Sequence, residues 1–366
     1  MTVTSNTTFV VNRENLHEHQ VLERDPIQPG DLAEGEVLLA IDRFSFTANN
    51  ITYAALGDAF KYWNFFPAEH PWGQIPVWGF ADVAASRHPE IAEGTRVYGY
   101  LPMARQLKVE PGRVSKSGFT DVAAHRTDLP GIYNQYVFTA NDPAYRPEHE
   151  AFQMLLRPLL VTSFLLDDFM ARQDFFGAEQ VILTSASSKT SIALAHSVKK
   201  RGSLQSIGIT SARNKIFCES LGCYDHLITY DQIDKLDASR RVVMVDMAGS
   251  ASVISSVHHH FRENMVYSCL IGATHHDQVG SVKGLPGAKP EFFFAPTHMQ
   301  QRSRQMGIEL YSRMLVSDYA EFRLFCDQWL TVKRSDGEEA VTATYQQVLA
   351  GSVEPNTGHV VSFCLD

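Results

Sequence analysis

The sequence has little cysteine, and its cysteines follow no pattern. Only five occur in 366 residues, and no two of them form a C-x-x-C pair. Disulfide frameworks and structural zinc sites use cysteines in closely spaced pairs. We therefore predict no disulfide, no bound metal and a reducing, cytoplasmic environment.

Long apolar segments and excess positive charge are absent as well. The apolar run 155–166 is interrupted by Arg157 and Pro158, and it is shorter than the roughly 20 residues that span a bilayer. Residues 1–13 lack the basic and apolar regions of a secretory signal. The formal net charge is −9, whereas a nucleic-acid partner requires a basic surface. We expect no membrane partner and no nucleic acid.

The G-x-G-x-x-G fingerprint of dinucleotide sites is also missing. Residues 181–195 (VILTSASSKTSIALA) nevertheless read as a strand, a tight turn and a helix. The free amides and the dipole of a helix N-terminus favour an anion. We predict that the turn binds a phosphate group through Ser187, Ser188, Lys189 and Thr190. Because serine disfavours positive φ, we expect the backbone of the turn to avoid it.

The chain is longer than one hydrophobic core usually supports, and its pattern changes near residue 150. Alternating strands at 36–46 and 96–101, separated by frequent prolines, predict a β-rich domain over 1–150. Alternating strands and helices then predict a parallel sheet over 151–330. We expect the C-terminal segment 331–366 to return to the β-rich domain. The expected strands of the second domain cover 180–183, 206–210, 226–229, 241–245, 264–271 and 291–296, and its helices 157–170, 189–200, 215–221, 252–261 and 308–329.

The order of these features resembles the medium-chain dehydrogenase/reductase superfamily from about residue 36 to 365. The closest likeness is to its zinc-free, quinone-reductase-like branch, and within it to a divergent bacterial family of unassigned function. The resemblance implies an α/β protein, with a Rossmann doubly wound parallel sheet and a GroES-like β-rich domain. The segments that carry it are 35–40 (GEVLLA), 49–57 (NNITYAALG), 79–84 (GFADVA), 94–99 (GTRVYG), 181–195, 220–225 (SLGCYD), 227–230 (LITY) and 245–249 (VDMAG).

Two departures from the superfamily pattern narrow the expected chemistry. Gly79, Ala81 and Ala84 stand where most relatives have Gly-x-Glu-x-x-Gly, so the acidic residue is missing. The cysteine that would begin a catalytic zinc site is also missing, with Thr47 and Asn49 in its neighbourhood. Because catalytic zinc needs three protein ligands, we expect a zinc-independent protein.

The end of the second strand of the parallel sheet favours NADP over NAD. An NAD site usually places a carboxylate there for the ribose 2′-hydroxyl, whereas a basic group accommodates a 2′-phosphate. This chain has Ser211, Arg213 and Lys215 and no carboxylate. Ser211 and Lys215 also match 2′-phosphate contacts in the resembling branch. Alternatively, Ser211 caps a helix and the two basic side chains are merely solvated.

The resemblance assigns further residues to the cofactor. It places Tyr230 near the adenosine end. It places Ala248, Gly249, Ile271, Gly272 and Ala273 beside the nicotinamide, mainly through backbone groups. His275 and His276 follow directly and could face the same cleft, whereas we expect 258–260 (HHH) to lie on the surface or in packing contacts, because consecutive helical residues point in different directions.

Hydride transfer to a carbonyl needs a donor for the charge that develops on oxygen. Tyr53 matches a tyrosine near the substrate in zinc-free relatives, and Tyr62 and Lys61 in an aromatic loop are further candidates, unless these side chains only pack. Asn50 could orient the carbonyl.

We therefore predict an NADPH-dependent, zinc-independent oxidoreductase that reduces a small carbonyl or α,β-unsaturated carbonyl compound of apolar or aromatic character. The resemblance also implies a homodimer. Two alternatives remain: an NADP(H)-binding sensor or structural protein without turnover, and a non-redox lyase or hydrolase on the same fold.

Overall fold

The computed structural model describes residues 5–272 and 284–365, which fall into two compact units. Unit 1 takes its described residues from 5–155, 331–353 and 357–365. Unit 2 takes them from 156–272, 284–330 and 354–356. The three residues 354–356 thus belong with unit 2, although the chain on both sides of them belongs with unit 1.

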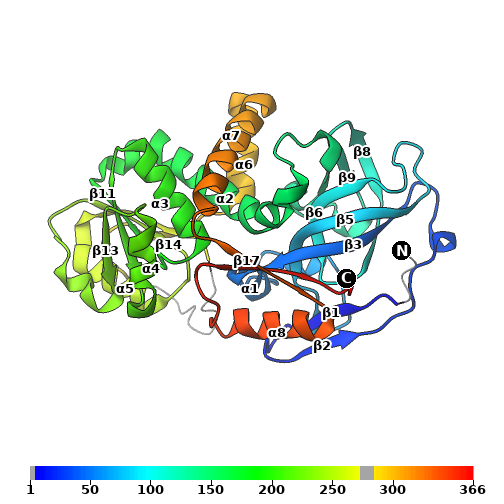
Figure 1. Cartoon of the computed structure of the whole chain (residues 1–366). Helices are drawn as coiled ribbons and strands as arrows, with labels where there is room; N and C mark the ends of the chain where they lie inside the picture. The colour runs from blue at the N-terminus through cyan, green and yellow to red at the C-terminus, as the bar shows by residue number, and fades with distance from the viewer. Residues whose placement is uncertain (1–4, 273–283, 366) are drawn as a thin grey trace. The chain divides into compact units, whose positions relative to one another are not determined.

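Unit 1 is built on a nine-stranded sheet and a three-stranded sheet (Figure 1). The larger sheet has the order β17-β18-β3-β5-β6-β10-β9-β8, with β7 also paired to β3, and the smaller has the order β2-β1-β4. The strands are β1 (Thr8–Asn12), β2 (His19–Leu22), β3 (Val37–Phe46), β4 (Trp72–Gly73), β5 (Pro76–Ser86), β6 (Arg96–Pro102), β7 (Gln106–Val109), β8 (Pro111–Ser115), β9 (Gly118–Asp121), β10 (Gln135–Phe138), β17 (Thr331–Asp336) and β18 (Thr357–Ser362), with helices α1 (Ala48–Ala55) and α8 (Glu338–Leu349).

Strand β3 organises this unit. It carries Val37, Leu39 and Ile41 at alternate positions, and all three side chains enter one hydrophobic core. It pairs antiparallel with β5 on one side and with β18 near the C-terminus on the other, where Phe46 lies opposite His359. The last strand of the chain therefore completes the sheet that the first part begins.

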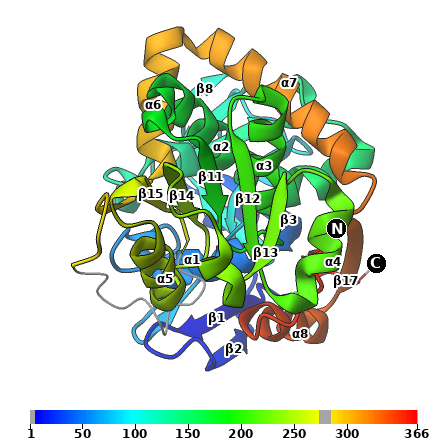
Figure 2. The same ribbon diagram turned by 90° about the vertical axis from the view of Figure 1, so that its left-hand side faces the viewer.

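Unit 2 contains a six-stranded sheet in which every pair of neighbours is parallel. Its order is β13-β12-β11-β14-β15-β16, and Figure 2 shows β15, β14, β11, β12 and β13 side by side. Numbered from β11 as the first strand, this is the 3-2-1-4-5-6 order of dinucleotide-binding sheets. The elements are β11 (Gln180–Leu183), α3 (Lys189–Arg201), β12 (Gln205–Thr210), α4 (Ala212–Leu221), β13 (His226–Thr229), β14 (Val242–Asp246), α5 (Ala251–Phe261), β15 (Met265–Leu270), β16 (Pro290–Phe292), α6 (Ala295–Met306) and α7 (Ile308–Cys326), and α2 (Glu150–Arg172) links the two stretches of chain.

The predicted α/β class, with a doubly wound parallel sheet and a β-rich part, is confirmed. One local expectation needs correction. The strand expected over 291–296 is shorter, because Pro296 lies in the first turn of α6, where proline's fixed φ suits a helix start. Strand β17 was not expected, since its sequence (TVKRSD) is largely polar and half-exposed. None of the helices in the described ranges has both the length and the apolar character needed to cross a membrane.

Candidate functional site

The predicted phosphate turn connects β11 to α3 at the carboxyl end of the parallel sheet. Ser188 is the N-cap of α3, and its hydroxyl accepts a hydrogen bond from the Ser191 N–H at 3.2 Å. Two hydrogen bonds hold the backbone of Ala186 in the turn. The Ala186 N–H donates to the Ile209 carbonyl at 2.9 Å, and the Tyr224 hydroxyl donates to the Ala186 carbonyl at 2.7 Å. The Ala186 backbone in the turn is therefore held by Ile209 on β12 and by Tyr224 in the loop before β13.

The backbone of this turn does adopt positive φ, so our expectation that it would avoid it is wrong. Ser185 lies in the left-handed region, with φ of 47°. A non-glycine residue there costs roughly 1–2 kcal/mol. The hydroxyl of Tyr230 lies 3.5 Å from the Ser185 hydroxyl, so the residue predicted for the adenosine end reaches the turn.

The first turn of α4 packs directly against the phosphate turn. The Asn214 side-chain amide donates to the Ser187 hydroxyl at 2.9 Å. Ser211 stands at the N-cap of α4, yet its hydroxyl makes no capping hydrogen bond. Its neighbour Arg213 is more than half exposed, and Lys215 is paired with Glu219 at 3.8 Å. The structure therefore brings together the two groups of residues that the sequence assigned to the phosphates.

A carboxylate lies at this end of the sheet, although the local sequence has none. Glu354 forms an ion pair with the Arg213 guanidinium, across 141 positions of the chain. The next residue, Pro355, accepts a hydrogen bond from Lys189 Nζ through its carbonyl at 3.4 Å. The segment 354–356 therefore contacts a predicted cation of the phosphate turn and another of α4.

Lys189, a predicted phosphate ligand, has a lowered pKa. Its side chain is largely buried at the start of α3, and burial lowers its pKa from 10.5 to about 8. The residue is therefore charged at neutral pH, but it loses its proton within the mildly alkaline range.

A buried carboxylate links β11 and β14, the two strands at which the order of the sheet reverses. The Thr184 hydroxyl donates to Asp246 Oδ1 at 2.6 Å, and the Gly249 N–H donates to Asp246 Oδ2 at 2.6 Å. Gly249 has φ of 76°, a conformation that favours glycine. Sequence reasoning missed Thr184 and Asp246, although an aspartate that ends an apolar strand (VVMVD) was a usable signal.

The predicted nicotinamide-side residues lie after β14 and β15. Ala248 is buried, and the Ile271 N–H donates to the Asp246 carbonyl at 2.9 Å. Gly272 packs so closely that a Cβ there would lie 2.0 Å from the Met247 carbonyl oxygen. Ala273, His275 and His276 lie outside the described residues.

The packing role expected for the histidines at 258–260 agrees with the contacts of His258. It is fully buried on α5, and its ring nitrogens lie 2.9 Å from the Pro286 carbonyl and 2.9 Å from the Ser268 hydroxyl.

In unit 1, the candidate donors Tyr53 and Tyr62 belong to a buried cluster of aromatic side chains. Trp78 Nε1 donates to the Tyr53 hydroxyl at 3.3 Å, and the hydroxyls of Tyr62 and Tyr133 are 3.3 Å apart. Tyr100 completes what we call the tyrosine cluster (Tyr53, Tyr62, Tyr100, Tyr133), with its ring 4.6 Å from that of Tyr133. Sequence reasoning missed Tyr100 and Tyr133, which are distant in the chain from the aromatic loop.

The tyrosine cluster consists of neutral phenols. Burial raises the pKa of all four hydroxyls, and those of Tyr100 and Tyr133 lie well above 10. Within the described part of the chain, the Tyr100 hydroxyl is fully buried without a hydrogen-bond partner. A buried hydroxyl without a partner lowers the stability of the folded protein. The Tyr100 O–H is therefore available to donate one hydrogen bond.

Asn50 and Lys61 have different surroundings. Asn50 caps its own helix, because its Oδ1 accepts from the Thr47 N–H at 2.8 Å while its Nδ2 donates to the Pro76 carbonyl at 2.8 Å. Lys61 is exposed in a left-handed conformation with φ of 59°. Their roles toward a substrate stay predictions.

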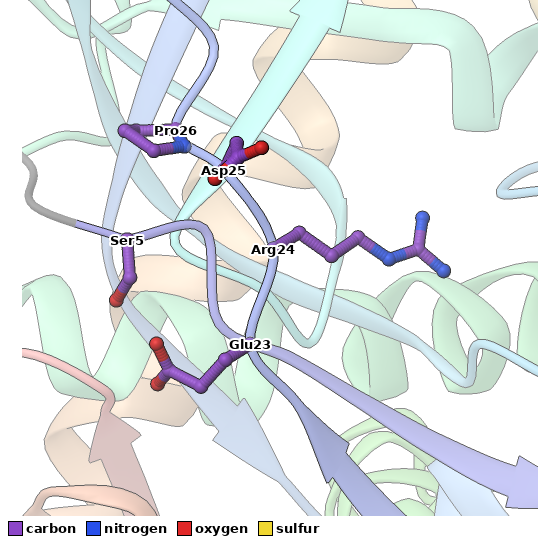
Figure 3. A pocket seen from close by; sticks show the side chains of 5 residues that line it. All are labelled: Ser5, Glu23, Arg24, Asp25 and Pro26. Carbon is purple, nitrogen blue, oxygen red and sulfur yellow. The ribbon is translucent and has the colours of Figure 1, made fainter.

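A polar pocket of about 560 Å³ lies elsewhere in unit 1, lined by Ser5, Glu23, Arg24, Asp25 and Pro26. Figure 3 shows the Ser5 hydroxyl and the Glu23 carboxylate pointing toward one another, with Arg24 extending away. None of the predicted site residues lines it, and we do not assign it to the site. Over residues 5–272 and 284–365, no three His, Cys, Asp or Glu side chains gather as metal ligands.

Comparisons with known proteins give the fold a context. A family profile described as protein of unknown function (DUF2855) matches residues 44–354. A search of curated proteins gives no match.

Solved structures resemble the chain over nearly its whole length. CurA from Vibrio vulnificus, crystallised with NADPH, is 13% identical with a TM-score of 0.63, covering 98% of this chain and 100% of its own. A putative NADPH:quinone reductase from Mesorhizobium loti is 12% identical with a TM-score of 0.61, covering 99% of both chains. The yhdH oxidoreductase from Salmonella enterica, in complex with NADP, is 13% identical with a TM-score of 0.53, covering 97% of this chain and 99% of its own. The α/β fold predicted from the sequence, with a Rossmann-type parallel sheet and a β-rich part, is confirmed.

The lowered pKa of Lys189 predicts a pH-dependent stability. Between about pH 8 and 10.5 the unfolded chain binds more protons than the folded one, so the Lys189 contribution to the free energy of unfolding increases as the pH rises. Lys189→Met removes this titration. The stability of wild type relative to this variant should therefore increase by about 1 kcal/mol from pH 7 to pH 9 in urea unfolding. Lys235→Met, at an exposed lysine, should show no such change; an equal change in both variants would contradict the assignment.

Proposed function

We propose that this chain, which belongs to the family of proteins of unknown function DUF2855, is a zinc-independent, NADPH-dependent oxidoreductase that reduces a small carbonyl or α,β-unsaturated carbonyl compound. The observation that carries the proposal is the 3-2-1-4-5-6 sheet with the Ser187–Thr190 turn after its first strand and Arg213 after its second. In open α/β sheets, ligands bind beyond the carboxyl ends of the strands where the strand order reverses.

The residues at this end of the sheet fit a dinucleotide. The positive end of the α3 dipole favours an anion, and the Ser187 hydroxyl and the Lys189 ammonium add donors for a diphosphate. The planar guanidinium of Arg213 suits a 2′-phosphate. Gly249 and Gly272 fix the backbone of the loops after β14 and β15, because Gly249 has φ of 76° and a Cβ at Gly272 would collide with the Met247 carbonyl. When bound, the dihydronicotinamide supplies the hydride.

The tyrosine cluster would stabilise the charge that develops on the substrate oxygen. Burial raises the pKa of its phenols, so at neutral pH each hydroxyl keeps its proton and can donate. A donor in a buried, apolar setting is preorganised and acts more strongly than one in water. The surrounding aromatic side chains favour an apolar or aromatic substrate.

The neighbouring structures support this assignment without fixing the substrate. Two of them were determined with NADPH or NADP, and the third is described as a putative NADPH:quinone reductase. The homodimer expected from the sequence stays a prediction.

A binding protein without turnover is the second candidate. The close packing of the tyrosine cluster favours this candidate, because all four of its side chains are buried. Tight NADPH binding without oxidation by enones, quinones or aldehydes would identify such a protein.

Replacing Arg213 tests the cofactor assignment. Arg213→Ala should weaken NADPH binding about tenfold, since charge-assisted pairing to the 2′-phosphate is lost, and should leave NADH binding nearly unchanged. Isothermal titration calorimetry measures both. Arg304→Ala, at an exposed arginine of α6, is the matched control. Equal losses for NADPH and NADH, or no binding of NADPH to wild type at millimolar concentration, would refute the assignment.

Replacing Tyr53 tests the donor. Tyr53→Phe should lower kcat for the best substrate of an enone, quinone and aldehyde panel by about 10- to 100-fold, because one hydrogen bond to the developing oxyanion is lost. The Kd for NADPH should not change. NADPH oxidation at its near-ultraviolet band gives kcat, with Tyr145→Phe as a control at a hydroxyl that donates to Glu150 at 2.9 Å. Unchanged turnover in Tyr53→Phe would show that Tyr53 only packs.

A further inference from the structure

The segment 354–356 is the feature of unit 2 that neither the sequence nor the comparisons explain. It reaches the parallel-sheet unit from the C-terminal part of the chain, between α8 and β18. Its backbone is held at the phosphate turn by the hydrogen bond from Lys189 Nζ to the Pro355 carbonyl. Proline fixes its own φ, so the conformation of this short segment is restricted.

This anchoring places the Glu354 carboxylate on Arg213. The pair is exposed, with 55% of the Arg213 side chain and 64% of the Glu354 side chain accessible to solvent. An exposed ion pair of this kind is weak, and a stronger anion can replace it. Arg213 is also close to the turn, because the adjacent Asn214 bonds to the Ser187 hydroxyl.

We propose that Glu354 is a specificity-determining residue, whose carboxylate competes with the 2′-phosphate of NADPH for Arg213 and thereby limits the preference for NADPH over NADH. This inference rests on the proposed function, since it concerns the same cofactor site. A 2′-phosphate carries up to two negative charges and competes with the carboxylate for the guanidinium, which the ion pair engages through Nη2. NADH has a hydroxyl at this position and leaves the ion pair intact.

The ion pair reduces the preference for NADPH over NADH without abolishing it. With Glu354 present, the charge of Arg213 is partly neutralised before the cofactor binds. The Glu354 carboxylate also repels the 2′-phosphate. Removing the charge of Glu354 frees the guanidinium without removing it. The effect is electrostatic and close to the surface, so it should weaken as salt concentration rises.

The test uses the full chain and the probe 2′,5′-ADP, which carries the 2′-phosphate without the nicotinamide; 5′-ADP lacks that phosphate. Glu354→Gln should bind 2′,5′-ADP and NADPH about fivefold more tightly than wild type, which is the upper range for an exposed ion pair. Its affinity for 5′-ADP and NADH should be unchanged. In the Arg213→Ala background, Glu354→Gln should have no effect, because the competition needs the guanidinium. Glu339→Gln, at an exposed glutamate of α8, controls for net charge.

Each other outcome has a definite meaning. Equal affinity of wild type and Glu354→Gln for 2′,5′-ADP would overturn the competition while leaving the proposed function intact. Weaker NADH binding in Glu354→Gln would also overturn it, because the carboxylate would then hold the ribose hydroxyl. If none of the variants or the wild type binds 2′,5′-ADP or NADPH, the proposed function itself fails.

Discussion

The reversal of strand order between β11 and β14 is the constraint on which the proposed site depends. The chain leaves these two parallel strands in opposite directions along the sheet, so the loops that follow them diverge beyond their carboxyl ends. The Thr184–Asp246 hydrogen bond ties the two strand ends together at this point. The phosphate turn and the Gly249 loop are therefore both built from a shared, rigid base.

The turn itself shows how a dinucleotide-type element can form with few glycines. Ser185 takes the left-handed conformation that glycine usually supplies, and the Ala186 backbone is held by Ile209 and Tyr224. The hydrogen bonds of Ala186 offset the unfavourable free energy of this conformation. Ser187 and Lys189 stand where glycine would leave bare backbone, so the proposed anion site would use a hydroxyl and a charge.

The sequence was informative wherever local pattern decides the structure. The apolar run before Ser185, the small polar residues of the turn and the apolar residues that follow sufficed to predict β11, the turn and α3. It was less informative where contacts join distant positions: Glu354 meets Arg213, and Tyr133 meets Tyr62, only because the fold brings them together. Strand β17 could not be predicted, since its side chains are polar and its partner β18 provides the pairing. Asn50 illustrates a third limit, because its residue type fits a substrate contact and a helix cap equally well.

We propose that the carboxyl end of the parallel sheet holds NADPH. A crystal structure of the full chain soaked with NADPH tests it most directly. We expect the diphosphate against Ser187–Thr190 and the 2′-phosphate within hydrogen-bonding distance of Arg213, in place of Glu354. A cofactor bound elsewhere, or none at millimolar NADPH, would contradict it.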